Sequence, residues 1–600
     1  MDSLWSMSTT VREAKRVKGF LKVAKKMEGL EWTHENQAKF QVMLVQYHEY
    51  LNDPSNGQTF QKLDVDQCKW LMKIEEIIPY DIAESIIIAK NYTGGPEMRG
   101  RQSMSPLIKL GLVYKDKDNI IRISDVGNKY INDEITDEEF FIDSLVKLQY
   151  PNPIDESYST RNIKPFIAIL QLIKKVNELC KLKGMKEKGI SKDEFGIFAL
   201  SILDYRKIDE YAQLIVDYRI KYESIHNNAD KKEFKESYIL SFLSNYYKPL
   251  NNYDEYADNM IRYIRQTKLI YIRGKYENIY IDLEPRRIVE INMLLSSDDA
   301  KPLIFSDMQS WIDYYSNYGT YDLPYETDEL LREIISNINK DNSDNAGKYN
   351  ISYNEIIPTG DKKNLKVLVT KAREERTRIQ NVVLKQEYFD TSKIDETIDM
   401  LLAINNRDKS KLTFKPSLEL EKWVNIALNI INDSILIKPN TKVGDDNEPI
   451  NTAPPGVADI ECYYNDFNMI CEVTMLTSRD QWFNEGQPVM RHLRDFENKD
   501  VKVSYCLFVA PSIHQDTLNT FWYSTKYEYE GKKQNIIPLT IKQLNEVLLS
   551  VKKLHSIGEK MKSQVFMDLL KRCSNVSGLG NTNDWKNKIS SELSIWATTV

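Results

Sequence analysis

The sequence of 600 residues exceeds the length of a single domain, which usually contains about 50–250 residues, so three or four domains are expected. Its composition is that of an ordinary soluble protein, 42% hydrophobic and 28% charged, and no apolar run approaches the roughly 20 residues that span a bilayer. The net charge of −7 excludes a surface that is basic throughout, so any contact with nucleic acid must come from local basic patches.

The cysteines and the first residues indicate the compartment. Six cysteines are scattered without paired spacing, which favours a reducing environment and argues against a zinc site. The opening segment MDSLWSMSTT has no apolar signal core. A bias toward Ile, Asn, Lys and Tyr is typical of an AT-rich genome. We therefore expect a bacterial protein of the cytoplasm.

The first predicted domain, residues 1–150, opens with a basic segment. Residues 11–27 carry seven Lys or Arg side chains, and their apolar residues recur at helical spacing, which predicts a basic amphipathic helix. Two interpretations stay open. One is a solvated face, and the other is an arm that contacts DNA phosphates.

The second half of this domain has the order helix, hairpin, helix. Residues 103–110 are predicted to be helical, two short strands surround a polar turn at 116–119, and a helix follows at 125–131. This is the layout of a winged helix-turn-helix, which places the helix before the wing in the major groove of DNA. The alternative is a winged helix that contacts only protein. The candidate DNA-binding residues are Arg99, Arg101 and Lys109.

The second predicted domain, residues 151–295, repeats this order. A basic helix over 257–270 precedes a hairpin at 271–283, and Pro285 is expected to open another helix. We interpret this segment as a second winged-helix-like module, so that two modules together read a longer, asymmetric site. Its candidate DNA-binding residues are Arg262, Arg265 and Lys268.

Residues 296–400 are predicted to form a helical linker domain. The acidic, aromatic-rich stretch 298–322 is interpreted as helical core packing rather than as a platform for single-stranded bases. A loop is expected at 341–348, and a highly charged helix at 362–386. Because no catalytic constellation is found here, the block is interpreted as a spacer between DNA recognition and chemistry.

The candidate chemistry lies on a hairpin at residues 458–474. The segment ADIECYYNDFNMICEVT alternates as two strands, with a two-residue turn at Asn465-Asp466. With that turn, the ladder brings Asp459 opposite Glu472. Opposed side chains in an antiparallel pair have Cβ atoms about 4.5–5.5 Å apart, where like charges repel.

Two carboxylates in that position need a cation between them or a shared proton. Oxygen ligands alone suit a hard cation such as Mg²⁺. The alternative is a solvated hairpin with incidental acids, and the spacing alone leaves it open.

The flanking elements of the last predicted domain, residues 401–600, form an α/β arrangement. A helix over 418–432 puts Glu421 on an apolar stripe, where it is either a partly exposed acid or a third acid of the metal site. Pro488 is expected to open a helix, with Glu485 just before it and His492 in its first turns. The other predicted elements are strands at 435–438, 503–510 and 536–540, a helix at 516–522 and further helices to the end.

This order of elements resembles the PD-(D/E)xK nucleases. Two positions depart from that motif, since Ala458 stands in place of its proline and Thr474 in place of its lysine. Read as a whole, the chain resembles the AlwI-type type IIS restriction endonucleases and the related site-specific nicking endonucleases. The segments that carry this resemblance are ADIECYYNDFNMICEVT, EGQPVMRHL, YCLFVAPSI and IIPLTIKQLNEVLL, with SPLIKLGLVYKDKDNIIRISDVGNKYI and LVKLQYPNP in the first domain.

The resemblance implies a fold class and a set of roles. The fold would be multidomain and mostly α with α/β, made of winged-helix recognition modules, a helical linker and a PD-(D/E)xK nuclease domain. Glu485 and His492 would complete the site in place of the missing lysine, and Glu421 would assist the metal shell. The ligands of Mg²⁺, for which Mn²⁺ can substitute, would be Asp459, Glu472 and the carbonyl of Val473.

The implied function is a type IIS endonuclease that binds a short asymmetric duplex site and cuts at a fixed distance outside it. One active site per chain cuts one strand, so a monomer would nick, and double-strand cutting would need a second copy or a smaller nuclease subunit. The rival is a non-catalytic winged-helix DNA-binding regulator whose nuclease-like domain is inactive. An ATP-driven enzyme is disfavoured because the chain has no GxxxxGK[ST] phosphate loop.

Overall fold

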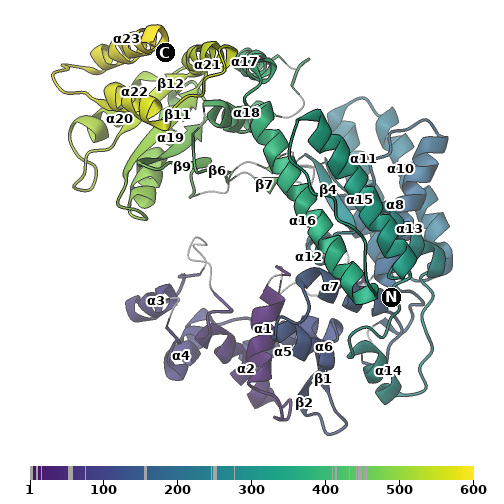
Figure 1. Ribbon diagram of the computed structural model, residues 1–600. Coiled ribbons are helices and arrows are strands. Elements are labelled where there is room, and N and C mark those ends of the chain that lie inside the picture. The colour runs from purple at the N-terminus through teal and green to yellow at the C-terminus, as the bar shows by residue number, and fades with distance from the viewer. Residues whose placement is uncertain are drawn as a thin grey trace. The chain divides into compact units, whose positions relative to one another are not determined.

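Figure 1 shows the computed structural model of the protein, which is mostly helical. None of the helices that the structure describes combines the length and the apolar character of a membrane span. The described residues are 4–7, 11, 13–14, 16–51, 59–73, 76–154, 158–244, 246, 253–275, 278–408, 410–412, 415–431, 433–440, 442–443, 449–451, 453 and 456–599.

The chain divides into two compact units. The first contains residues 1–273 and 278–330, and the second contains residues 274–277 and 331–600. The finer division into four domains stays a prediction.

The N-terminal part of the first unit is built on a close crossing of two helices, α2 and α5. A Cβ on Gly100 of α5 would lie 1.9 Å from the carbonyl oxygen of Gln37 on α2, so only glycine allows this approach. Beside the crossing, the buried Ser103 hydroxyl donates to Oε1 of Gln41 at 2.9 Å. The helices of this part are α1 (Arg16–Lys25), α2 (His34–Gln46), α3 (Val65–Met72), α4 (Tyr80–Lys90) and α5 (Gly95–Lys109).

Helix α5 begins eight residues before the predicted start at 103. Gly94 adopts a left-handed conformation just before it, and Pro96 lies in its first turn, where a missing N–H costs nothing. Arg99 and Arg101, which were expected to lie before or on the helix, are therefore both on it. The sequence prediction overlooked this proline as a start signal.

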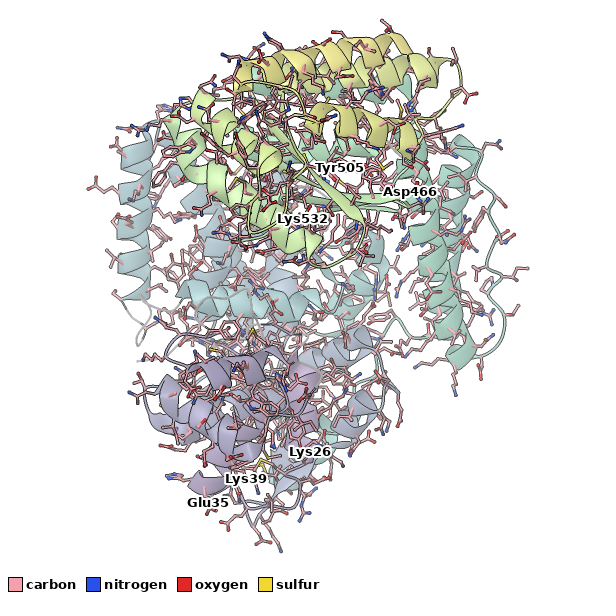
Figure 2. All side chains as sticks on the ribbon, turned by 90° about the vertical axis from the view of Figure 1, so that its left-hand side faces the viewer. Lys26, Glu35, Lys39, Asp466, Tyr505 and Lys532 are labelled. Atoms are coloured by element: carbon pink, nitrogen blue, oxygen red, sulfur yellow. The ribbon has the colours of Figure 1, made fainter. Side chains whose placement is uncertain are left out.

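Within the basic segment at 11–27, residues Arg16–Lys25 form a helix, α1, and cations of this helix and of the turn after it contact the protein. Lys18 forms an ion pair with Asp133, and Lys25 with Glu28. The Nζ of Lys26, labelled in Figure 2, lies 4.7 Å from the ring centroid of Tyr47. These contacts give the helix a structural role within the first unit.

The predicted hairpin and helix after α5 are confirmed. Strand β1 (Val113–Lys115) pairs antiparallel with β2 (Ile121–Ile123), and α6 (Asp125–Ile131) has the predicted bounds. The turn is held by Asp116, whose Oδ1 accepts hydrogen bonds from the N–H groups of Asp118 and Ile120.

The rest of the first unit is helical around a three-stranded sheet of order β3-β5-β4. The predicted hairpin at 271–283 is confirmed as β4 and β5, and β3 adds a strand that was not predicted. The helix before it ends at 265 rather than 270, because the chain turns at Lys268, which has a φ of 56°. The strands are β3 (Ile190–Ser191), β4 (Ile270–Lys275) and β5 (Asn278–Leu283), and the helices are α7 (Asp137–Lys147), α8 (Pro165–Leu182), α9 (Lys192–Ile197), α10 (Ile208–Ser224), α11 (Asn228–Leu243), α12 (Tyr253–Arg265), α13 (Ile288–Ser297) and α14 (Met308–Tyr315), with 3-10 turns at Ala199–Ser201, Tyr205–Lys207 and Pro285–Arg287.

The aromatic stretch at 298–322 packs in a core, as predicted. Trp311 and Tyr315 of α14 are 1% and 2% exposed, and their rings stack with centroids 4.7 Å apart. They are therefore not available to bases.

After α14, the block predicted as a spacer continues with α15 (Asp328–Lys348), α16 (Lys362–Glu387) and α17 (Thr391–Asn405), the last of which runs past residue 400. The loop predicted at 341–348 is wrong, because these residues form the last turns of α15. Asn342 and Ala346 continue its buried face, and the Asn342 amide donates to the carbonyl of Ala372 on α16 at 3.3 Å. The polar composition of DNSDNAGK concealed this periodicity.

The second unit is built on a five-stranded mixed sheet of order β12-β11-β10-β9-β6. Strands β10, β11 and β12 are parallel, whereas β9 is antiparallel to both β10 and β6. The strands predicted at 503–510 and 536–540 are confirmed residue for residue. The strands are β6 (Leu436–Pro439), β7 (Lys442–Val443), β8 (Pro449–Asn451), β9 (Ile460–Tyr463), β10 (Phe467–Val473), β11 (Val503–Ala510) and β12 (Ile536–Thr540), and the helices are α18 (Pro416–Ile431), α19 (Arg479–Glu497), α20 (Gln515–Lys526), α21 (Ile541–Ser556), α22 (Ser563–Ser574) and α23 (Thr582–Thr599).

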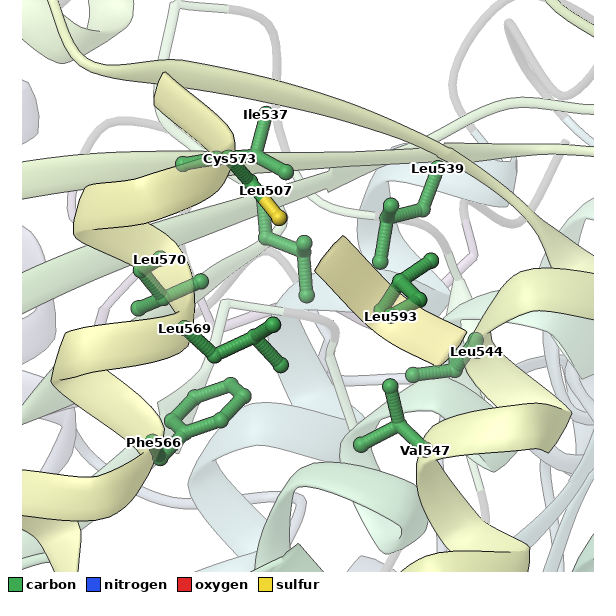
Figure 3. Close-up of a pocket in the computed structure, with 10 residues that line it drawn as sticks. All are labelled: Leu507, Ile537, Leu539, Leu544, Val547, Phe566, Leu569, Leu570, Cys573 and Leu593. Atoms are coloured by element: carbon green, nitrogen blue, oxygen red, sulfur yellow. The ribbon is translucent and has the colours of Figure 1, made fainter. Parts of the chain in front are cut away.

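The core of this unit packs closely between the sheet and its last helices. Figure 3 shows the apolar cavity lined by Leu507 and Leu539 of the sheet and by Leu544, Phe566 and Cys573 of the helices. Its space of about 10 Å³ is apolar and barely admits one water, so it is a packing defect and not a ligand site.

Candidate active site

The acid-bearing hairpin has the predicted turn and register. Strands β9 and β10 pair with Cys471 opposite Ile460. At the other end, the N–H of Tyr464 donates to the carbonyl of Phe467 at 3.1 Å, which closes a two-residue turn. The second residue of that turn, Asp466, is labelled in Figure 2. The predicted turn is therefore confirmed.

Asp459 and Glu472 lie side by side at the end of this ladder. The N–H of Val473 donates to Oδ2 of Asp459 at 2.8 Å, and a hydrogen bond joins the Asp459 and Glu472 side chains. Burial, then repulsion from Glu472 and Glu421, raises the pKa of Asp459 well above its usual value. Burial and repulsion from Glu485 raise the pKa of Glu472 in the same way. The pair thus favours a shared proton or a bound cation.

His492 contacts this pair from α19. Its Nδ1 lies 2.8 Å from Oε1 of Glu472. When Glu472 is ionised, Nδ1 carries the proton and donates it, which leaves Nε2 as an acceptor. Nε2 is buried and has no hydrogen-bond partner among the described residues. Burial, aided by repulsion from Arg491, lowers the pKa of His492, which favours the neutral imidazole.

Glu485 lies on the same helix, which is longer than predicted. Helix α19 begins well before Pro488, so this proline is inside the helix and does not open it. The helix is capped by Ser478, whose side chain accepts a hydrogen bond from the N–H of Asp480. This N-cap is the start signal that the prediction missed. Glu485 and His492 are consequently two turns apart on one face. Burial raises the pKa of Glu485, although a hydrogen bond with Thr474 and attraction by His492 oppose that shift.

Glu421 reaches the cluster from α18. Its side chain is buried, its Oε2 accepts a hydrogen bond from the N–H of Ala453 at 3.1 Å, and its charge raises the pKa values of both central acids. The structure thus brings together the predicted catalytic residues Asp459, Glu472, Glu485, His492 and Glu421.

The donor set of this cluster fits a hard divalent cation, because the central groups offer carboxylate oxygens. Within the described ranges, no group of three or more His, Cys, Asp or Glu is already arranged around a metal position. Each acid is instead turned to a partner in the protein: Asp459 to Val473, Glu472 to His492. A cation between these two acids would relieve the repulsion that raises the pKa of Asp459.

Glu461 is a buried acid to which the sequence prediction gave no role. It lies on β9, two residues beyond Asp459, and this spacing puts both side chains on the same side of the extended chain. Its oxygens lie 3.2 Å from Nζ of Lys438 and 3.3 Å from Nζ of Lys499. Burial raises the pKa of Glu461, but these two lysines outweigh burial and lower it. The ion pairs keep its charge from adding to that of the central acids.

The candidate DNA-binding residues of α5 are held differently from one another. Arg101 is exposed. The guanidinium of Arg99 lies 4.9 Å from the ring centroid of Tyr92. Nζ of Lys109 donates to the carbonyl of Ser6 at 3.0 Å, which ties its charge to the N-terminal segment.

The candidates near α12 also differ. Arg262 forms an ion pair with Asp258 at 2.9 Å, Arg265 is partly buried in the last turn, and Lys268 is exposed just after the helix. Arg101 and Lys268 are thus the two of these six cations with exposed side chains.

Comparisons with known proteins place the chain among the restriction endonucleases. A family model described as the AlwI restriction endonuclease matches residues 108–547, well over half of the sequence. The chain therefore belongs to the AlwI restriction endonuclease family.

Several solved structures of restriction endonucleases are similar to the chain at low identity. The small subunit R.BspD6I2 of the heterodimeric restriction endonuclease R.BspD6I is 24% identical, with 33% of this chain and 98% of that chain covered and a TM-score of 0.29. The BpuJ1 endonuclease binding domain in complex with modified DNA is 20% identical, with 39% and 82% covered and a TM-score of 0.27. FokI bound to DNA is 11% identical, with 95% and 98% covered and a TM-score of 0.22. No curated protein matches the chain.

Proposed function

We propose that the protein is a Mg²⁺-dependent type IIS endonuclease, which binds a short asymmetric duplex site and hydrolyses phosphodiester bonds at a fixed distance outside it. One observation carries this proposal. In a member of the AlwI restriction endonuclease family, Asp459 and Glu472 are held against each other with raised pKa values, next to a histidine whose Nε2 is buried. Perturbed carboxylates beside a neutral base are typical of hydrolytic sites.

Asp459, Glu472 and the carbonyl of Val473 would hold Mg²⁺, with Mn²⁺ as a substitute. When bound, such an ion polarises the scissile phosphate and makes a water more acidic. The chain contributes by fixing the two carboxylates on adjacent strands of one hairpin. The N–H of Val473 orients Asp459, which leaves that residue's second oxygen for the cation.

His492 would position the attacking water and accept its proton at Nε2. Glu472 orients the ring through Nδ1, so the proton acceptor is fixed in one tautomer. Glu485, whose side chain is hydrogen-bonded to Thr474, would assist His492. Together, Glu485 and His492 would replace the lysine of the PD-(D/E)xK motif. Glu421 would support the metal shell through water.

Recognition would fall to two winged-helix modules, one at α5, β1 and β2 and the other at α12, β4 and β5. Both have a helix followed by a hairpin, and both carry cations on or beside that helix. The helical residues 296–400 would separate these modules from the catalytic residues, which accounts for cleavage outside the site.

One active site per chain would cut one strand. A monomer would then nick the duplex, and cutting of both strands would need a second copy of the chain or a smaller nuclease subunit.

Run-off sequencing of both strands of a digested plasmid tests the proposed function. With Mg²⁺ we expect breaks at a constant distance from one short asymmetric sequence. Breaks at random positions would contradict recognition by two modules. DNA binding without any cutting in Mg²⁺ or Mn²⁺ would instead identify a winged-helix regulator with an inactive nuclease-like domain.

A further inference from the structure

Helix α16 has one buried face and one exposed face. Leu365, Val369, Ala372 and Ile379 are buried on the first. The helix carries eight Lys or Arg and three Glu, in a chain whose net charge is −7. This long helix is labelled in Figure 1.

Three lysines share the exposed face of α16. Lys363, Lys371 and Lys385 are exposed, and at 3.6 residues per turn they fall within about 80° of arc. None of them forms an ion pair or a side-chain hydrogen bond within the part of the chain that the structure describes. Arg378 lies on the same face, but its charge is paired with Glu375. One further acid, Glu374, is exposed there.

The lysines of α16 contrast with those of the other basic helix, α1. In α1, Lys18 and Lys25 are paired with acids, and Lys26, just after the helix, lies over a tyrosine ring. Those charges stabilise the first unit. Lys363, Lys371 and Lys385 have no such partner in the described chain, so their unpaired charge must be explained by solvent or by an anionic partner.

We propose that the exposed face of α16 is a contact surface for the phosphate backbone of duplex DNA. This proposal rests on the proposed function, and it extends DNA contact to the helical block that separates recognition from cleavage. The surface would position the duplex without reading its bases, because lysines act on phosphates as point charges.

The dimensions of the face suit a duplex. Lys363 and Lys385 are 22 residues apart, which corresponds to about 33 Å along a helix. A duplex carries one negative charge per about 1.7 Å of its axis, so phosphates lie within reach of lysines at any such spacing. Three lysine–phosphate contacts would release counterions and make binding dependent on salt.

The test compares full-length wild type with the triple variant K363Q/K371Q/K385Q. Binding to a duplex of random sequence and to a fragment that wild type cuts is measured in EDTA over a range of NaCl concentrations. We expect the slope of log K against log salt to fall in magnitude by about 2–3, since each phosphate contact contributes about 0.9. At low salt the affinity should fall at least tenfold for both duplexes, with the cleavage position unchanged.

Two further proteins keep this test decisive. The control K542Q/K571Q/K586Q removes three exposed lysines from α21, α22 and α23. It should keep the wild-type slope. The variant K363R/K371R/K385R keeps the charge and should also behave as wild type, which would assign the loss in the glutamine variant to the missing charges.

Two results would overturn the proposal: an unchanged slope in the α16 glutamine variant, as expected if the partner is an acidic protein, or an equal loss in the control. If the wild-type protein binds DNA but never cuts it, the proposed function is refuted. The binding measurement in EDTA still tests the contact surface on α16, because it does not depend on cleavage.

Discussion

At the scale of single residues, the site is dominated by the repulsion between buried acids. Burial and repulsion from Glu472 and Glu421 raise the pKa of Asp459, and burial and repulsion from Glu485 and Glu421 raise the pKa of Glu472. A cation relieves that repulsion, and so does neutralising one acid. The cluster therefore links cation binding to the stability of the second unit.

Replacing one central acid should separate stability from catalysis. We expect Asp459→Asn to abolish DNA cleavage while DNA binding in EDTA stays unchanged. Because the variant lacks one of the repelling charges, its melting temperature in EDTA should rise by about 2 °C or more, as a gain of about 1 kcal/mol produces in a unit of this size.

Asp466→Asn, an exposed change in the turn of the same hairpin, is the matched control and should cut normally. Calorimetry with and without Mg²⁺ measures the effect. A melting temperature that falls in Asp459→Asn would show that this carboxylate stabilises the metal-free protein, contrary to the argument.

The imidazole of His492 makes a second prediction at this scale. If Nε2 accepts the proton of the attacking water, His492→Gln should lower kcat by about 10²–10⁴-fold, the usual contribution of a general base, and leave DNA affinity unchanged. Single-turnover cleavage rates and binding in EDTA measure the two effects. His226→Gln, at an exposed histidine of the first unit, should cut at the wild-type rate. A loss below fivefold in His492→Gln would assign the proton to another group.

At the scale of elements, strands and helices with a regular hydrophobic pattern were predictable. Helix ends were not predictable where two start signals compete or where the buried face is small or polar. The hairpin and its turn followed from period-two alternation, and the strand at 503–510 from a near-continuous apolar run. The start of α19 was predicted too late because Pro488 is a helix-opening signal, whereas the actual N-cap, Ser478, lies upstream. The end of α15 was hidden because its buried face there consists of Asn342 and Ala346, which are small or polar.

All five residues of the candidate site were predicted, Glu485, His492 and Glu421 through the family resemblance, but the contacts between them were only partly predictable. The register of one hairpin gave Asp459 and Glu472, because adjacent strands need no knowledge of the rest of the fold. The contact between Glu472 and His492, and the hydrogen bond from Ala453 to Glu421, join distant segments. Spacing in the sequence contains no information on such packing.

The crossing of α2 and α5 makes a prediction about these elements. In Gly100→Ala the new Cβ would meet the backbone oxygen of Gln37, so one helix must shift. We expect a loss of about 1–3 kcal/mol in stability, as overpacking usually costs, and weaker DNA binding.

Gly347→Ala on α15 is the control for this change, because a Cβ there meets nothing within 4 Å. It should leave stability unchanged or raise it slightly, since alanine favours a helix. Urea unfolding of both variants measures the difference. If Gly100→Ala and Gly347→Ala are equally stable, α5 can be displaced without cost, and its close approach to α2 does not contribute to stability.

At the scale of the whole molecule, the candidate residues for reading and for cutting lie in different compact units. The six predicted DNA-binding cations belong to residues 1–273, and the five predicted catalytic side chains belong to residues 331–600. Substitutions in one set should therefore leave the function of the other intact. Under the proposed function, each chain would supply one catalytic cluster to each DNA site that it binds.

The proposed single active site per chain predicts the order of products on a supercoiled plasmid with a single site. With limiting enzyme, nicked circles should form first, because one cluster breaks one strand. Linear plasmid should appear only as the enzyme concentration rises, and more steeply than in proportion to it, if a second copy supplies the second cluster. Adding Asp459→Asn protein to wild type should then suppress linear product while nicking continues. Gel electrophoresis of a time course measures both forms, and linear product without a nicked intermediate at the lowest concentrations would contradict the one-cluster argument.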